Sequence, residues 1–428
     1  MPTTLWLLVL TAAAAFVGAA TVVSPVLGAA IAAAAALVIV VTRQPDLLAL
    51  LIVPGSLVLF RVGGAVTATE VLTVVAAALA VPLLLREPIP RPLAIGLASG
   101  VAYQVLLMTA VVAHPSAAAF LEWGHRGTIV LGGILVGAWL GRTGRLGLAV
   151  TLLAVGVAVL GAVAVVQTFT SGFEPAYPLG FHKNFVGSLS ATCLLVLIVV
   201  RSEIPLRRWA WWTVVALLGA GLVACQSRGG LIALATGLVV WSVAGRMHGR
   251  SKRAKVGLVV AAAAAAVAIQ SVISELDPRQ FDEFSSSAVR SQVQTETIAL
   301  WLTNPWTGVG LVYEANPLYR TRALDNGALN AALQALAEGG LLSLAALLIL
   351  VLGTTYALYN GRGTLAAAGL AVLWGRLAHG MVDHYWTAST STVTWVVVGA
   401  GLVSAAAAAG TRADQSVSSE GHRARAES

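Results

Sequence analysis

The chain has 428 residues, of which 58% are hydrophobic and only 10% are charged, and its mean hydropathy is +0.86. This composition excludes an ordinary soluble domain. Repeated apolar runs of roughly 17–25 residues match the length that an α-helix needs to cross a bilayer. Because a helix satisfies its own backbone hydrogen bonds in lipid, the sequence predicts an all-α, polytopic membrane protein.

The apolar runs predict about fourteen spans within a single transmembrane domain, residues 1–410. They are expected near 4–23, 26–42, 47–60, 66–85, 92–113, 127–141, 145–167, 184–200, 208–224, 229–245, 256–273, 338–358, 364–382 and 390–409. The third run is short and contains Pro54-Gly55, which also fits a re-entrant segment, and twelve spans would keep the same faces. The first run lacks a basic n-region, so we expect a retained span. The Ser-rich, charged residues 411–428 predict a disordered cytoplasmic tail.

Positive charge indicates the orientation of these spans. Most of the 26 Lys and Arg residues fall in every second connection, and such connections face the cytoplasm. The pattern predicts a multi-pass protein of the cytoplasmic membrane with both termini inside and the long polar segment 274–337 outside. The pI near 10.0 then follows from topology, and no nucleic-acid partner is expected.

The long outer segment 274–337 is where we expect chemistry. A helix is predicted from Arg290 to Asn304-Pro305, followed by a Gly-rich turn over 306–310. After a turn that contains Asp325, a second amphipathic helix is predicted to lead into the membrane. Its polar stripe recurs every four residues: Asn326, Asn330, Gln334 and Glu338. A carboxylate as deep as Glu338 needs a partner, and we expect an outer-face Arg.

Two further outer clusters flank predicted spans. His182, Lys183 and Asn184 start the eighth span, either as a snorkelling Lys beside an interfacial His or as contacts for an anion and a hydroxyl. Arg228 lies in the tight turn 226–230, where a guanidinium is costly unless it faces a polar cavity or an anion. Its planar fork suits a phosphate.

The thirteenth span carries Arg376, His379 and Asp383, with His384 next. Their spacing of three and four predicts one shared helix face, as an internal ion-pair network or as part of a site. Metal spacing and a phosphate-binding Gly-rich loop are both missing from the sequence, so no cofactor is expected. Cys193 and Cys225 support neither a disulfide framework nor a metal site.

The order of these features resembles one family. The motifs are Gly180-x-His-Lys-Asn184, Ser227-Arg-Gly-Gly230, an Arg in the long loop, Asn304-Pro-x-x-Gly-x-Gly310 and Asn330-x-x-Leu-Gln-x-Leu-x-Glu-x-Gly340. Together they resemble the O-antigen ligase and O-antigen polymerase family of membrane glycosyltransferases. The resemblance covers about residues 180–345.

The resemblance implies transfer of a glycan from a polyprenyl-pyrophosphate carrier to a glycan or glycolipid acceptor, outside the cytoplasmic membrane and without metal. It implies that Arg228 and Arg290 hold the pyrophosphate and that Lys183 and Asn184 help line the cavity. Further candidates for substrate contact are Asn330, Gln334 and Asp325. Whether the chain is a ligase or a polymerase stays open.

One position departs from the family. Many ligases have His-Asn where this chain has Leu329-Asn330, and Leu cannot accept the proton of the acceptor hydroxyl. The replacement bases that we rank are His182, then His384, then Glu338. Two other function classes stay open, a transporter or flippase of a lipid-linked or anionic solute and a non-catalytic glycolipid scaffold. Against a transporter, no inverted repeat is visible and the polar residues gather on one face.

Overall fold

The computed structural model describes residues 45–57, 61–62, 66–244, 286–316, 318–319, 328–361, 363–383 and 390–404. Several predictions fall outside these residues. They are the spans at 4–23, 26–42 and 256–273, the tail 411–428, Asp325 and His384.

The described chain is helical, apart from the two-residue strands β1 (Arg61–Val62) and β2 (Val66–Thr67), which pair antiparallel. The helices are α3 (Pro45–Gly55), α4 (Ala68–Leu84), α5 (Arg91–Ala113), α6 (Ala117–Gly127), α7 (Gly133–Arg142), α8 (Leu146–Thr170), α9 (Lys183–Val199), α10 (Arg208–Ala224), α11 (Arg228–Val243), α13 (Ser286–Thr303), α14 (Ala331–Asn360), α15 (Thr364–Gly380) and a helix at Ser391–Ser404. A π-helical turn, η1 (Thr128–Gly132), joins α6 to α7, and short 3₁₀ turns are η2 (Pro178–Gly180), η3 (Arg201–Glu203) and η4 (Tyr313–Ala315).

Three described helices are long and apolar enough to cross a bilayer: α5, α8 and α14. Shorter apolar helices coincide with the predicted spans at 66–85, 184–200, 208–224 and 229–245. The prediction of an all-α membrane protein is therefore confirmed. By contrast, α3 has 11 residues and contains Pro54. At about 1.5 Å per residue it is too short to cross the hydrocarbon alone, which agrees with a re-entrant segment.

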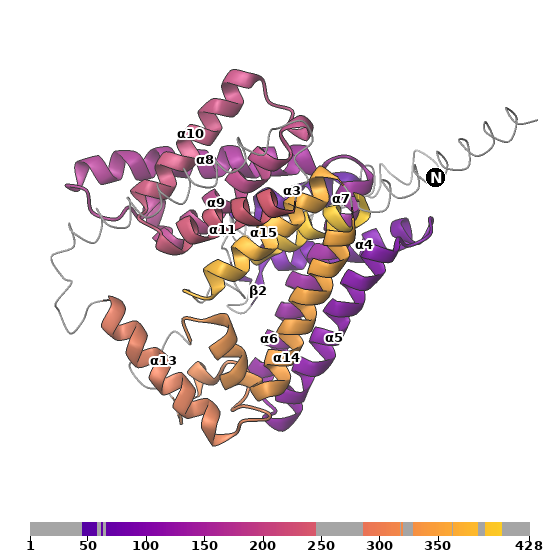
Figure 1. Ribbon diagram of the computed structural model, residues 1–428, viewed down its shortest axis with the longest axis vertical. Helices are drawn as coiled ribbons and strands as arrows, with labels where there is room; N and C mark the ends of the chain where they lie inside the picture. Colours follow the sequence, from indigo (N-terminus) through magenta and orange to yellow (C-terminus); the bar gives the residue numbers. More distant parts are fainter. Residues whose placement is uncertain are drawn as a thin grey trace, which may run out of the picture.

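The helices pack in two connected groups (Figure 1). α5 and α14 lie side by side along much of their length, while α11 packs against both α9 and α15, and α8 packs against α10. Small residues allow the closest approaches, as expected for helices in lipid. A Cβ at Gly161 in α8 would lie 2.6 Å from the Leu217 carbonyl oxygen, and one at Gly221 would overlap Gly161 itself.

Two helices extend beyond the predicted spans. α6, η1 and α7 form one continuous helical stretch that starts at Ala117, well before the span predicted at 127–141. Because α6 contains polar side chains, the hydropathy pattern did not predict it as part of a span. α14 starts at Ala331 instead of Glu338 because Asn330 caps it, and the predicted amphipathic helix and the following span are one element.

α14 is broken inside. Gly339 and Gly340 leave helical geometry, with φ of −141° and +62°. Such a break frees backbone groups that need new partners when they are buried. The Gly-rich turn after α13 supplies them through hydrogen bonds from Val309 N to Ala337 O (2.8 Å), from Gly310 N to Glu338 O (2.9 Å) and from Leu341 N to Pro305 O (2.9 Å).

The glycines of both segments permit this fit. A Cβ at Gly340 would overlap the Trp306 carbonyl, and one at Gly308 would overlap the backbone of Ala337 and Glu338. Both residues have positive φ, which other residues rarely adopt. We call the pairing of residues 305–310 with 337–342 the clasp. His114, which follows α5, joins it through Nε2, 2.9 Å from the Gly308 carbonyl oxygen.

Candidate functional site

The start of α9 places two predicted site residues beside the end of α15. His182 is the N-cap of α9, and its Nδ1 accepts a hydrogen bond from the backbone N–H of Asn184 (3.3 Å). The Asn184 amide nitrogen donates to Asp383 Oδ2. Lys183 lies between these two residues in the sequence and is the first residue of α9. Its side chain is half-buried. The structure thus brings the predicted 182–184 cluster to Asp383.

The start of α11 presents Arg228. Ser227 caps this helix by accepting a hydrogen bond from Gly230 N (3.3 Å), and Arg228 is half-buried. The next residue, Gly229, contacts the imidazole of His379 so closely that a Cβ would overlap the ring. A helix N-terminus carries partial positive charge, which adds to the guanidinium in favouring an anion.

Asn330 ties α14 to α15. Its side-chain oxygen accepts hydrogen bonds from Ala332 N (2.9 Å) and Leu333 N (3.1 Å), while its amide nitrogen donates to Met381 O (3.0 Å). Through these contacts the starts of α9, α11 and α14 meet the end of α15. Arg290 lies in α13, which packs against α14, but its side chain is outside the described residues.

The predicted shared face of Arg376, His379 and Asp383 is wrong for Asp383. α15 ends at Gly380, so Asp383 lies beyond the helix. The Arg376 guanidinium donates instead to three hydroxyls, those of Ser188, Thr390 and Ser391. It joins α15 to α9 and to the helix at Ser391–Ser404.

Glu338 has the Arg partner that its depth requires. Arg126 of α6 donates two parallel hydrogen bonds to its carboxylate, Nη1 to Oε2 and Nη2 to Oε1, both 2.7 Å. Arg126 Nε donates to Glu122 Oε1 at 2.7 Å. The Arg126 and Glu338 side chains are 6% and 1% exposed, so the pair is sealed from solvent. Bidentate geometry is the strong form of this interaction.

The two last residues of the polar stripe, Gln334 and Glu338, therefore face the protein interior. Gln334 Nε2 donates to Glu338 Oε1 (3.0 Å), and both residues line a cavity of about 20 Å³ with Tyr103 and Ser343. That volume is enough for about one water molecule. The Ser343 hydroxyl faces it without a hydrogen-bond partner among the described residues.

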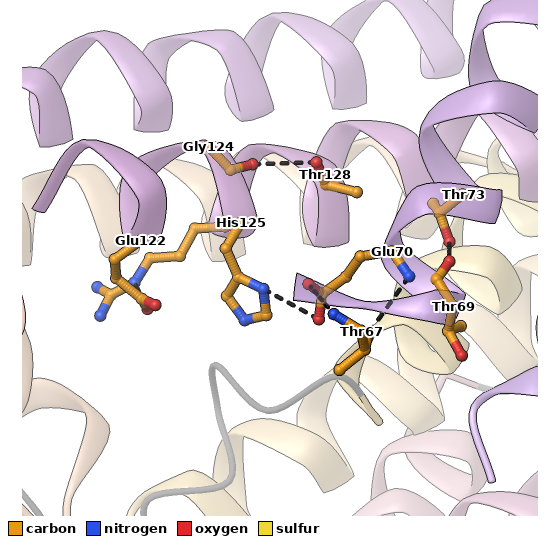
Figure 2. Close-up of polar contacts among 9 residues, drawn as sticks. Thr67, Thr69, Glu70, Thr73, Glu122, Gly124, His125 and Thr128 are labelled. Carbon is orange, nitrogen blue, oxygen red and sulfur yellow. Dashed lines mark hydrogen bonds and ion pairs between the residues drawn. The ribbon is translucent and has the colours of Figure 1, made fainter. Parts of the chain in front are cut away.

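A second acid–base contact lies one residue before Arg126. His125 Nδ1 is 3.1 Å from Glu70 Oε1, and Figure 2 shows the imidazole directed from α6 toward the start of α4. Glu70 also exchanges hydrogen bonds with Thr67. Its Oε2 accepts from Thr67 N (3.1 Å), and Thr67 Oγ1 accepts from Glu70 N (3.3 Å), which is a capping box.

Glu314 adds a further acid to this region. Burial, and then the negative charge of Glu338, raise the pKa of the Glu314 carboxyl above its ordinary value. Its Oε2 has no hydrogen-bond partner among the described residues. Glu70, Glu122 and Glu338 are each paired, Glu70 with His125 and the other two with Arg126, so among the four carboxyls of this region Glu314 is the one without such a pairing in the described part of the chain.

Three of these residues were missed from the sequence: Arg126, His125 and Glu70. The signal for Arg126 was indirect, since the depth of Glu338 predicted an Arg partner but did not identify which Arg. The pairing of His125 with Glu70 left no signal, because the two residues lie 55 positions apart in unrelated helices. Among the described residues, no group of three or more His, Cys, Asp or Glu is placed to hold a metal ion.

Residues 212–348 match the family model described as O-antigen ligase. No curated protein matches the chain. The matched region includes the start of α11 with Arg228, all of α13 and the clasp, so it contains most of the motifs that carry the resemblance. The predicted resemblance to the O-antigen ligase and polymerase family is therefore confirmed over residues 212–348, about a third of the chain, and the match supports a role in glycan transfer during polysaccharide assembly.

Proposed function

We propose that the chain transfers a glycan from a polyprenyl-pyrophosphate carrier to a hydroxyl of a glycan or glycolipid acceptor at the outer face of the cytoplasmic membrane. The observation that supports this most is the meeting of the motif segments. Asn184 contacts Asp383, Gly229 contacts His379 and Asn330 contacts Met381, so the segments that resemble the family lie around the end of α15.

Arg228 is assigned to the pyrophosphate. Its place at the first turn of α11 combines a planar guanidinium with the positive end of a helix. Arg290, from α13, is the second cation for the same group. Pyrophosphate is an activated leaving group, so fixed positive charge aimed at its oxygens in a low-dielectric site supplies much of the catalysis without metal or nucleotide.

The other predicted residues divide by their contacts. Lys183 and Asn184 line the site beside the pyrophosphate, and Asp325 is assigned to acceptor contact. Asn330 and Gln334 act through position, because the Asn330 amide caps α14 and holds α15 while Gln334 supports Glu338.

The test uses purified protein in lipid nanodiscs. The donor is the lipid-linked glycan pool extracted from a strain that lacks this gene, and the acceptor is the glycolipid fraction of the same strain. We expect a longer or relocated glycan together with free polyprenyl pyrophosphate. A transporter would leave every covalent bond intact. Recovery of unchanged donor from folded wild-type protein supplied with donor and acceptor would therefore overturn the proposal.

The matched variants are Arg228→Lys and Arg208→Lys. Arg228→Lys keeps the charge and loses the planar fork, so transfer should fall by at least about 10-fold while thermal stability changes little. Arg208 is exposed at the start of α10, whereas Arg228 follows the end of α10. The Arg208→Lys variant should therefore transfer at the wild-type rate. Equal transfer by both variants would refute the assignment of Arg228.

A further inference from the structure

We propose that the end of α13, together with the turn that follows it, is an interfacial anchor that docks on the surface of the lipid bilayer. The anchor consists of Ile298, Ala299, Leu302 and Trp306, and its partner is the boundary between headgroups and acyl chains of one leaflet. Docking of this kind is separate from the proposed transfer reaction and does not depend on it.

The exposed side chains of α13 change in character along the helix. In its second half they are mainly apolar, and the turn after it exposes an indole: Ile298 is 41% exposed, Leu302 60% and Trp306 66%. Exposed apolar side chains that gather in one segment mark an interaction site with a protein or a membrane. Trp is enriched at the boundary between membrane and water. In the first half of α13, the exposed residues are polar: Ser291, Gln292, Gln294 and Thr295.

The part of α14 after its break matches the thickness of the hydrocarbon layer. Residues 341–360 form about 30 Å of helix and contain no Asp, Glu, Lys or Arg. Their exposed side chains follow one helix face and end in two Tyr residues, as expected at a membrane boundary. The break at Gly339 and Gly340 therefore lies at the opposite boundary. The exposed residues of this face are Leu341, Leu348, Ile349, Leu352, Tyr356 and Tyr359.

The clasp holds the anchor at this boundary. Trp301 of α13 donates from Nε1 to the Pro305 carbonyl oxygen (3.1 Å), and the same oxygen accepts the backbone N–H of Leu341 (2.9 Å). The Trp306 carbonyl oxygen accepts the backbone N–H of Leu342 (3.4 Å). From this point α13 and the long part of α14 diverge (Figure 1). The exposed apolar side chains therefore lie at the depth of the membrane boundary, where bilayer lipid is the nearest apolar partner.

The polar groups of the segment do not oppose docking. Residues 297–313 contain no Asp, Glu, Lys or Arg, so no charge has to enter the interface. The Thr303 hydroxyl donates to the Leu300 carbonyl oxygen (2.6 Å), and the Thr307 hydroxyl donates to Asn304 Oδ1 (3.1 Å). A hydroxyl that already has a hydrogen-bond partner loses little when water is removed.

The experiment measures the depth of single fluorescent labels on the protein in phosphatidylcholine nanodiscs. Leu302→Cys and Gln294→Cys each receive a thiol-reactive NBD dye, and the unmutated chain gives the background of the buried Cys193 and Cys225. Bromine atoms near the glycerol end of the acyl chains should quench the label at 302 by roughly half, because the anchor lies in the interface. Bromine atoms near the methyl end should quench it less, and neither lipid should quench the label at 294.

Two matched double variants test whether the apolar side chains cause the docking. Both carry the label at Ala299→Cys. Leu302→Gln with Trp306→Gln should abolish the quenching, because membrane affinity scales with the apolar area that is buried. Gln292→Ala with Thr295→Ala changes two exposed polar residues of the same helix and should leave the quenching unchanged. All four side chains are exposed, so the Tm of both variants should stay close to that of the wild type.

Each outcome supports or overturns the anchor. Quenching at 302 by the shallow bromine atoms, together with its loss at 299 in the Leu302→Gln and Trp306→Gln variant, supports it. No quenching at 302 overturns it, whether the label is in water or is covered by a second copy of the chain, which a doubled particle mass would reveal. Equal quenching at 302 and 294, or quenching that survives in the Leu302→Gln and Trp306→Gln variant, also overturns it.

Discussion

The buried pair of Arg126 and Glu338 allows a quantitative prediction of stability. Arg126→Met removes three hydrogen bonds of 2.7 Å and leaves the Glu338 carboxylate buried without its cation. Breaking a buried pair from one side typically costs about 3–5 kcal/mol. We take about 3 kcal/mol, the lower end of this range.

This loss converts into a shift of the unfolding midpoint. At about 2.1 cal/mol/K per residue, a chain of 428 residues has an unfolding entropy of about 0.9 kcal/mol/K, so the Tm should fall by about 3 °C. Cys193 and Cys225 are free and buried, so a thiol-reactive fluorescent dye reports their exposure on unfolding.

The matched control and a rescue variant sharpen the test. Glu87→Gln breaks the ion pair between the Glu87 carboxylate and Arg142 (3.4 Å). Because the Glu87 side chain is 72% exposed, this variant should leave the Tm unchanged. Adding Glu338→Leu to Arg126→Met replaces the pair by apolar side chains and should recover much of the loss. A double variant no more stable than Arg126→Met alone would show that an unpaired carboxylate is not the cause.

Three further predictions concern topology, the clasp and pH. Single cysteines at Ser286 and Ser251 should react with an impermeant thiol reagent from opposite sides of the membrane, and labelling from one side would overturn the predicted orientation. Gly340→Ala should lower the Tm, since a Cβ there overlaps a backbone carbonyl, whereas Gly219→Ala, where a Cβ has nothing within 4 Å, should not; equal Tm values would contradict the strain argument. Because the pKa of the Glu314 carboxyl is raised in the folded state, its ionisation lowers stability as the pH rises from the ordinary value through the folded one. Glu314→Gln should therefore raise the Tm at pH 7 but not at pH 4, and a uniform effect would exclude the titration.

Hydropathy predicted the apolar helices well where they are apolar on all sides. The helix predicted at 208–224 has these bounds in the structure, and α9 and α11 differ by one or two residues from prediction. It failed at α6, because Glu122 and Arg126 are charged residues whose burial depends on partners in other elements.

The site was predictable only where local chemistry determines it. The depth of Glu338 demanded a cation, and that demand was correct, but nothing in the sequence connects it with a residue 212 positions away. The Gly-rich turn at 306–310 was predicted as a turn, whereas its partner, the break in α14, depends on tertiary contact. Likewise, Asn330 was expected on a polar stripe, but its contact with Met381 follows from the packing of α14 beside α15.

The clasp limits how this protein can be recombined with its relatives. Residues 305–310 and 337–342 exchange backbone hydrogen bonds and fit each other through glycines, although some 30 residues separate them in the chain. A chimera that imports the segment before α14 from a relative but keeps its own α14 would join halves that have not been selected together. Both must be exchanged together, preferably with the residue at 114 that contacts Gly308, if the scaffold of the chimera is to assemble.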